Sequence, residues 1–174
     1  MGEGLFYLNY LMMKKEDYKF SFEVYDAIDE LAEADAVLLR QAREVTQFAH
    51  APYSHFRVGA VAALENGQIV TGTNQENASF PIGLCAERVM LASSSSLFPG
   101  IPIKTIAISY NNEKGDSSHP ISPCGLCRQS LLEYEAKFKE PIRIILGGLQ
   151  GKVYIIEKAD MLLPLSFTAN ELNV

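Results

Sequence analysis

The first long pattern in the chain is helical. Between about Asp29 and Phe48, apolar residues recur at intervals of three and four positions, as they do on one face of an amphipathic helix. Pro52 follows shortly afterwards, and a proline in this place is a common sign that a helix has ended. The pattern predicts a helix from about Asp29 to Phe48, whose apolar face is formed by Leu31, Ala34, Val37, Leu38, Ala42, Val45 and Phe48.

The pattern then changes to that of short strands. Arg57–Leu64 and Gln68–Thr73 are two β-prone runs. They are separated by Asn66-Gly67, which is a strong signal for a hairpin turn. The residues that follow, Asn74–Leu84, include a proline and a glycine that favour a loop.

The second half of the chain alternates between helical and strand patterns. Strands that alternate with helices indicate a layered α/β domain. Residues 1–28 mix aromatic and charged residues without a clear period, so we expect an N-terminal extension over 1–28 and the domain over 29–174. The expected elements are a helix over Ala86–Leu97, a strand over Ile103–Tyr110, a loop over 111–123, a helix over Cys124–Phe138, and strands over Ile142–Leu146 and Val153–Ile156.

Composition narrows the class of ligand. The chain has 174 residues, of which 48% are hydrophobic, and this length suits one domain with an extension. Lys and Arg number 15 against 21 Asp and Glu, which gives a formal net charge of −6. Proteins that follow a phosphate backbone need clustered positive charge. We therefore expect no nucleic-acid partner, and small molecules are favoured as substrates.

The apolar runs and the cysteines indicate the compartment in which the protein works. Leu5–Met13 is the main N-terminal apolar stretch, and it is too short to span a bilayer. Lys14 and Lys15 follow this stretch, whereas the charges of a signal peptide precede its apolar region. The chain has three cysteines, two of them in a C-x-x-C pair, which suits a metal in a reducing compartment better than disulfides. We expect a cytoplasmic protein with no membrane partner.

All three cysteines lie in two short motifs, C-A-E-R at 85–88 and P-C-G-L-C at 123–127. Both motifs fall at predicted helix N-termini, where the partial positive charge and free N–H groups favour thiolates. Three thiolates can hold a zinc ion and leave its fourth tetrahedral position open. We expect Cys85, Cys124 and Cys127 to bind one zinc ion per chain.

Two residues beside Cys85 have expected roles at such a site. Glu87 is placed to shuttle protons for a hydroxide bound to the zinc. Taken alone, a glutamate in the first turn of a helix would only stabilise the helix dipole. Three thiolates exceed the charge of the zinc ion by one, and we expect Arg88 to be the main thiolate partner that offsets this charge.

Two other interpretations of the cysteines remain. A closed zinc site that only stabilises the fold needs a fourth protein ligand, for which the chain offers His50, His55 and His119. A redox-active C-x-x-C would leave Cys85 and Glu87 unexplained.

Three further segments extend the pattern: P-Y-S-H-F-R-V-G-A at 52–60, N-Q-E-N-A-S-F-P at 74–81 and L-L-P-L-S-F at 162–167. Together with the cysteine motifs they resemble, in order and spacing, the small zinc-dependent cytidine deaminases. The resemblance covers about residues 30–167. It implies a three-layer α/β/α fold with a mixed central sheet of about five strands. It also implies hydrolysis of cytidine and 2′-deoxycytidine to the uridine products with release of ammonia, as in pyrimidine salvage.

The resemblance implies binding roles as well. Asn74 and Glu76 would hydrogen-bond the ribose 3′-hydroxyl, Phe56 would pack against the nucleoside, and the Ala86 N–H would donate to the carbonyl of the base. Phe167 would reach into the site of a neighbouring subunit, because these enzymes are typically homotetramers with sites at subunit contacts. Without the resemblance, Asn74 would be expected to cap the backbone at the end of a strand. Phe56 could equally be a core residue or a site residue, and Phe167 would be only an aromatic residue near the C-terminus.

Other functions remain as alternatives. A related enzyme could act on a modified cytosine nucleoside, although the Asn74 and Glu76 pair argues for an intact ribose. Editing of RNA or DNA needs a basic groove, which the acidic balance disfavours. The alternative without catalysis is an interaction module that zinc stabilises.

Overall fold

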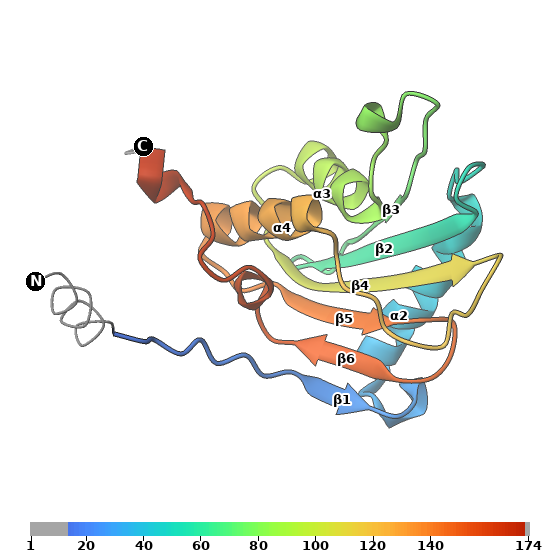
Figure 1. Ribbon diagram of the computed structural model, residues 1–174, viewed down its shortest axis with the longest axis horizontal. Coiled ribbons are helices and arrows are strands. Elements are labelled where there is room, and N and C mark those ends of the chain that lie inside the picture. The colour runs from blue at the N-terminus through green and yellow to red at the C-terminus, as the bar shows by residue number, and fades with distance from the viewer. Residues whose placement is uncertain (1–13, 173–174) are drawn as a thin grey trace, which may run out of the picture.

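The described residues of this computed structural model are 14–172, and within them the chain forms one mixed sheet of six strands. Their spatial order is β1-β6-β5-β4-β2-β3 (Figure 1). The strands are β1 (Glu23–Tyr25), β2 (Phe56–Leu64), β3 (Ile69–Thr73), β4 (Ile103–Asn112), β5 (Arg143–Gly147) and β6 (Val153–Ile156). The main helices are α2 (Glu33–Val45), α3 (Ala86–Leu97) and α4 (Gly125–Phe138).

The strand directions bring the starts of two helices together. β3 and β4 each pair antiparallel with β2, so they run parallel to one another. β4 and β5 pair directly and in parallel. α3 follows β3 and α4 follows β4, so both helices begin beyond the carboxyl ends of parallel strands. This edge of an α/β sheet is where ligands commonly bind.

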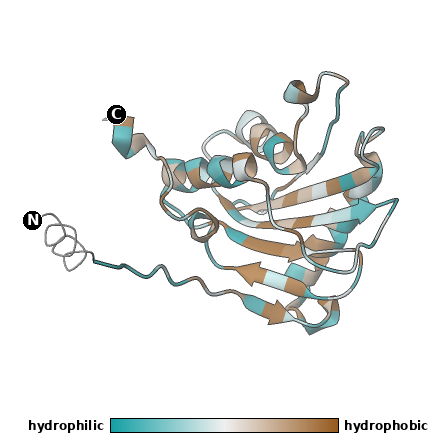
Figure 2. Ribbon diagram, viewed as in Figure 1, coloured by the Kyte–Doolittle hydropathy of each residue, from teal (hydrophilic) through white to brown (hydrophobic). Residues whose placement is uncertain are grey.

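Helices cover both faces of the sheet, which makes the expected three layers (Figure 1). On one face, Leu39 and Ala42 of α2 pack with Val61 and Ile145 of the sheet. On the other face, helices α3 and α4 bury residues such as Met90 and Leu131 against β2, β4 and β5. The hydrophobic residues of β5 form a continuous run, and those of β6 are interrupted at one position (Figure 2), as expected for strands between two helical layers.

Two glycines let the helices approach the sheet closely. A Cβ atom at Gly59 of β2 would collide with the backbone of α2 at Ala42. A Cβ atom at Gly72 of β3 would collide with the backbone of α3 at Ala86 and Met90. Gly72 therefore sets how deeply the first turn of α3 sits against the sheet.

The predicted first helix needs correction in its ends and its buried face. It is the α-helix Glu33–Val45 flanked by the 3₁₀ turns η1 (Ile28–Glu30) and η2 (Thr46–Phe48). Val37 is 41% exposed and Phe48 is 69% exposed, although both were expected on the apolar face. The sheet is contacted by the stripe centred on Leu38, Leu39 and Ala42, and Phe48 lies beyond the end of the α-helix.

The other elements agree with the predictions to within one or two residues, including the hairpin at Asn66-Gly67, where Gly67 has φ 80°. The sheet has six strands, where about five were expected. The additional strand β1 lies within the segment expected to be an extension and pairs antiparallel with β6. The apolar stretch Leu5–Met13 lies outside the described residues. Among the helices of residues 14–172, none combines the length and apolar character that crossing a membrane requires.

Candidate active site

The three cysteines meet where α3 and α4 begin. Cys85 is the N-cap residue of α3, Cys124 is the N-cap of α4, and Cys127 lies in the first turn of α4. The Sγ atom of Cys124 lies 3.7 Å from that of Cys85 and 3.5 Å from that of Cys127. All three sulfur atoms lie within 4.8 Å of one another. The predicted convergence of the two motifs is confirmed.

This cluster fits a zinc ion. Tetrahedral zinc with Zn–S bonds of about 2.3 Å places its sulfur ligands about 3.8 Å apart, close to the distances observed here. Within residues 14–172, the cluster includes no histidine or carboxylate ligand atom. The described part of the chain therefore supplies three ligands, as a catalytic zinc site requires, and none of His50, His55 and His119 closes the site.

Hydrogen bonding within the cluster also shifts the pKa values of Cys85 and Cys127 in opposite directions. Hydrogen bonding from the Cys127 thiol, and then from Cys124, together with the positive charge of Arg88, lowers the pKa of Cys85 to about 5 against the effect of burial. The same contact with Cys85, together with burial, raises the pKa of Cys127. Cys85 thus ionises more readily than Cys127, and it lies at the positive end of α3.

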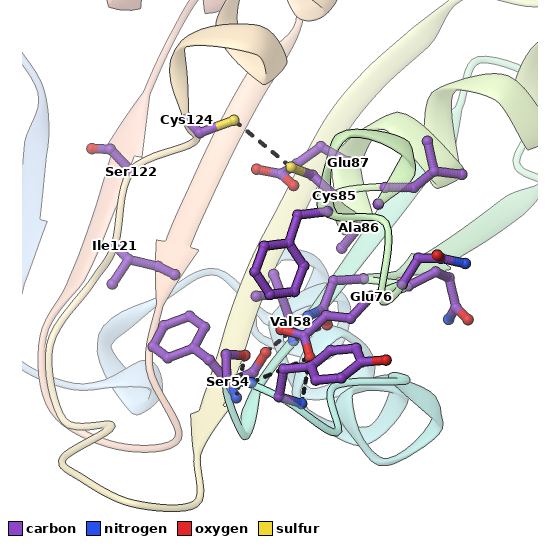
Figure 3. A pocket seen from close by; sticks show the side chains of 17 residues that line it. Ser54, Val58, Glu76, Cys85, Ala86, Glu87, Ile121, Ser122 and Cys124 are labelled. Carbon is purple, nitrogen blue, oxygen red and sulfur yellow. Dashed lines mark hydrogen bonds between the residues drawn. The ribbon is translucent and has the colours of Figure 1, made fainter.

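Glu87 lies in the first turn of α3, beside the cysteines, and is only 4% exposed. Burial raises the pKa of its carboxyl, and the charge of Cys85 acts in the same direction. The preceding residue, Ala86, is buried and occupies the first helical position, whose N–H has no acceptor within the helix. Glu87 and Ala86 both line a cavity beside the cysteines, so both can reach a ligand bound there (Figure 3).

Arg88 lies between the cysteine cluster and the loop that precedes α3. Its Nη2 atom donates to the Gly83 carbonyl at 2.9 Å. Its buried Nε atom has no hydrogen-bond partner among the described residues. The charge of Arg88 lowers the pKa of the Cys85 thiol, but the hydrogen bond from Cys127 has the larger effect. Its role as the main thiolate partner therefore stays a prediction.

The cavity beside the cysteines has a volume of about 760 Å³. Cys85 and Cys124 lie at one end, and Ser54 and Glu76 lie toward the other (Figure 3). Its lining comprises Tyr53, Ser54, Phe56, Val58, Asn74, Gln75, Glu76, Asn77, Phe80, Gly83, Leu84, Cys85, Ala86, Glu87, Ile121, Ser122 and Cys124. This lining includes every expected site residue except Cys127, Arg88 and Phe167. Cys127 is buried behind the cavity, within the sulfur cluster.

Asn74 and Glu76 hold the backbone around the cavity. Asn74 Oδ1 accepts from the Val58 N–H at 2.7 Å, and its Nδ2 donates to the Phe56 carbonyl at 2.8 Å. Glu76 Oε2 accepts from the N–H groups of Tyr53 and Ser54. An amide and a carboxylate have capacity for further bonds. The side chain of Asn74 therefore binds the backbone of β2. A contact of Asn74 and Glu76 with a sugar hydroxyl remains a prediction.

The ionisation of Glu76 is also set by these contacts. Desolvation alone would raise its pKa, but the Ser54 hydroxyl and the N–H groups of Tyr53 and Ser54 outweigh it and lower the pKa. The site therefore holds an ionised carboxylate at neutral pH, which is a strong acceptor for a hydroxyl group.

Phe56 has a support that the sequence did not reveal. Its ring stacks on that of Tyr110, with centroids 4.9 Å apart and planes 15° apart. The Tyr110 hydroxyl lies 3.3 Å from His119 Nδ1, so His119 contacts an aromatic support of the cavity and not the cysteines. Phe56 is part of the cavity lining and part of an aromatic stack at the same time.

Phe167 lies outside the cavity of its own chain. Its side chain is 59% exposed, and its backbone carbonyl accepts from Gln129 Nε2 at 2.9 Å. Its expected contact with a neighbouring subunit remains a prediction. Ile121 and Ser122, which sequence reasoning missed, line the cavity from the loop before α4 (Figure 3). Their position just before P-C-G-L-C was the available signal.

The family model for the cytidine and deoxycytidylate deaminase zinc-binding region matches residues 32–139. A curated cytidine deaminase from Halalkalibacterium halodurans is 34% identical over 139 residues, which cover 79% of this chain and 96% of that protein. One from Mycobacterium tuberculosis is 35% identical over 117 residues, which cover 65% of this chain and 84% of that protein.

Solved structures agree. The crystal structure of a cytidine deaminase from Burkholderia pseudomallei aligns with a TM-score of 0.66 and 33% identity, and the alignment covers 79% of this chain and 100% of that one. The family match spans more than half of this chain and contains all three cysteines and Glu87. Together with the three-thiolate cluster and the three-layer fold, this match shows that the chain belongs to the cytidine and deoxycytidylate deaminase family.

Proposed function

We propose that this protein hydrolyses cytidine and 2′-deoxycytidine to uridine and 2′-deoxyuridine and releases ammonia. The observation that carries the proposal is the open cluster of three cysteine sulfur atoms at one end of a cavity that also contains Glu87. The relatives from Halalkalibacterium halodurans and Burkholderia pseudomallei, each more than 30% identical over 79% of this chain, are cytidine deaminases. The same arrangement of site residues is expected to serve the same chemistry here.

The charge of the cavity favours a nucleoside over a nucleotide. Among the described residues, its lining includes Glu76 and Glu87 but no lysine, arginine or histidine. Proteins bind phosphate groups with arginine, lysine or clustered N–H donors. The 5′-phosphate of deoxycytidylate would enter this acidic cavity without a cationic partner. We therefore place neutral nucleosides ahead of nucleotides as substrates.

The chemistry divides between the metal and the chain. Zinc, when bound to Cys85, Cys124 and Cys127, supplies a Lewis acid that activates water for attack at neutral pH. Glu87 takes a first proton from the attacking water and gives it to the ring nitrogen of cytosine. It then takes the remaining proton of the added hydroxyl group, as the carbonyl of the product forms, and gives it to the departing amine. Water adds to the carbon that carries the amino group, and ammonia leaves, so that atoms and protons balance. The Ala86 N–H orients the base by donating to its carbonyl oxygen.

The sugar end of the cavity would hold the nucleoside in place. Glu76, whose carboxylate is fixed by two backbone N–H groups, accepts from the 3′-hydroxyl, and Asn74 lies beside it. Phe56 offers an apolar face to the nucleoside, and its ring stacks on that of Tyr110. A contact with the 3′-hydroxyl and none with the 2′-hydroxyl is consistent with both ribose and deoxyribose substrates.

We also infer a cytoplasmic homotetramer that acts in pyrimidine salvage. Exposed apolar side chains near the cavity, including Phe80 and Ile82, together with Phe167 in the C-terminal segment, support an assembly in which subunit contacts complete each site. The three free cysteines support a reducing compartment.

The proposal is tested with purified protein and four substrates side by side: cytidine, 2′-deoxycytidine, cytosine and deoxycytidylate. We expect release of ammonia from the two nucleosides and at most weak activity on the base and the nucleotide. A preference for deoxycytidylate would contradict the charge argument. Protein that binds zinc but deaminates none of these compounds would instead support the modified-nucleoside or interaction-module alternatives.

A further inference from the structure

A buried carboxylate on α4 plays no part in the chemistry proposed above. Glu135 is 8% exposed and lies on the same face of α4 as Cys127 and Leu131, at intervals of four residues. Its Oε1 atom accepts from the N–H groups of Ile142 at 2.7 Å and Ala159 at 2.8 Å. Its Oε2 atom accepts from the Asp160 N–H at 2.8 Å.

These three bonds account for the burial of a charged side chain. A buried carboxylate is tolerated when hydrogen bonds satisfy it, and three N–H donors do so here. Two of the donors, Ala159 and Asp160, open the 3₁₀ turn η4 (Ala159–Leu162), which packs against α4 (Figure 1). Glu135 therefore fixes the start of the C-terminal segment to the helix that carries Cys127.

Two further residues of α4 hold the same segment closer to the cysteines. Arg128 Nη1 donates to the Leu162 carbonyl at 3.1 Å. Gln129 Nε2 donates to the Phe167 carbonyl at 2.9 Å. The segment is thus bound to α4 at its beginning, its middle and near Phe167, and only the first contact is buried.

We propose that Glu135 is a positioning residue that, by binding the N–H groups of Ala159 and Asp160, sets the path of the C-terminal segment and hence the place of Phe167. This proposal rests on the proposed deaminase activity for its kinetic readout, because Phe167 is expected to close the site of a neighbouring subunit. Among the described residues, the hydrogen-bond partners of Glu135 are neither cysteines nor residues of the cavity lining, so its influence on turnover would pass through the segment.

Glu135→Gln tests the proposal because glutamine keeps the volume but turns one acceptor into an N–H₂ group facing N–H donors. The matched control is Glu140→Gln, which removes the same charge from an exposed position beyond α4. We expect Glu135→Gln to raise the KM for cytidine about 3- to 10-fold with kcat within about 2-fold, which is the signature of lost uniform binding. Zinc content should stay that of the parent protein.

Two readouts separate positioning from general loss of stability. Amide hydrogen exchange should lose protection over residues 159–168 and keep it over α2 and β4. In a double-mutant cycle, Glu135→Gln should add no increase in KM to that of Phe167→Ala, because both changes remove the same contact. If Glu135→Gln does not fold, Gln129→Met releases the exposed end of the segment and should raise KM in the same way.

The outcomes discriminate. An unchanged KM with unchanged exchange over 159–168 would overturn the proposal. So would additive effects with Phe167→Ala, or uniform loss of protection with a fall in kcat. If the parent protein deaminates no cytidine, the proposed function fails, whereas the exchange experiment still decides whether Glu135 positions the segment.

Discussion

The Sγ atoms of Cys85 and Cys124 lie 3.7 Å apart, although 39 positions of sequence separate the two residues. Each residue is the N-cap of a helix that follows one of two parallel strands. The contact therefore depends on the sheet, and Gly72 sets the depth of α3 against it. A metal site at this point links local helix starts to the global fold.

Removing one ligand should remove the metal. We expect Cys124→Ala to lose nearly all bound zinc and to lower the melting temperature, because zinc binding contributes to folding free energy. Metal analysis and thermal melting of the purified variant measure both effects. Ser130→Ala, an exposed hydroxyl on the same helix, is the control that should keep its zinc. A Cys124→Ala protein with full zinc content would mean that another ligand set holds the metal.

The sugar contact predicts discrimination against a missing 3′-hydroxyl. A hydrogen bond to a charged group contributes about 1.5–3 kcal/mol, so 2′,3′-dideoxycytidine should show a kcat/KM about 10- to 100-fold lower than 2′-deoxycytidine. Glu76→Gln should narrow this ratio, because it removes the charge of the acceptor. Equal kcat/KM values for the two substrates in the parent protein would show that Asn74 and Glu76 act only on the backbone.

Glu113 predicts a pH-dependent contribution to stability. Hydrogen bonds from Arg57 and His55 lower the pKa of its carboxyl. Because the folded pKa is the lower one, ionised Glu113 stabilises the fold above the unfolded pKa of about 4.3, and this effect is lost as pH falls through the folded pKa. Glu113→Gln should melt slightly lower than the parent at pH 7, since an exposed ion pair contributes little, and the gap should close in acid. A difference in melting temperature that widens in acid would mean that ionised Glu113 does not stabilise the fold.

The aromatic contact of the N-terminal segment predicts that this segment stabilises the sheet edge. Phe22 packs against Tyr154 of β6, with ring centroids 4.9 Å apart. Since Phe22 is only partly buried, Phe22→Ala should cost about 1–2 kcal/mol of unfolding free energy. Denaturant unfolding measures this value, and Tyr18→Phe, which removes only a hydroxyl, serves as the milder control. No loss of stability would mean that the segment rests on the sheet without supporting it.

The sequence predicted most helices, strands and turns because their formation depends mainly on residues that are neighbours in the chain. Asn66-Gly67 defines its own turn, and the runs that became α3 and β6 begin and end where the sequence indicated. The sequence did not show which side of α2 is buried, because the buried side of a helix depends on what the helix packs against. Val37 lies exposed for this reason, although it fits the apolar period.

The site shows the same division. The cysteine motifs were readable because metal ligands have characteristic types and spacing. The stack of Phe56 on Tyr110 was not readable, because this contact joins segments far apart in sequence. Asn74 had two plausible roles, and the structure shows that the backbone role is present.

The most direct measurement of the central claim is the turnover of Glu87→Gln together with its zinc content. Loss of a general acid–base group typically costs about 10²- to 10⁴-fold in rate, so this variant should retain the parent's zinc while its kcat for cytidine falls by at least about 100-fold. Glu140→Gln, prepared in parallel, should match the parent in both values. A zinc-loaded Glu87→Gln protein that deaminates cytidine at the parent's rate would contradict the account.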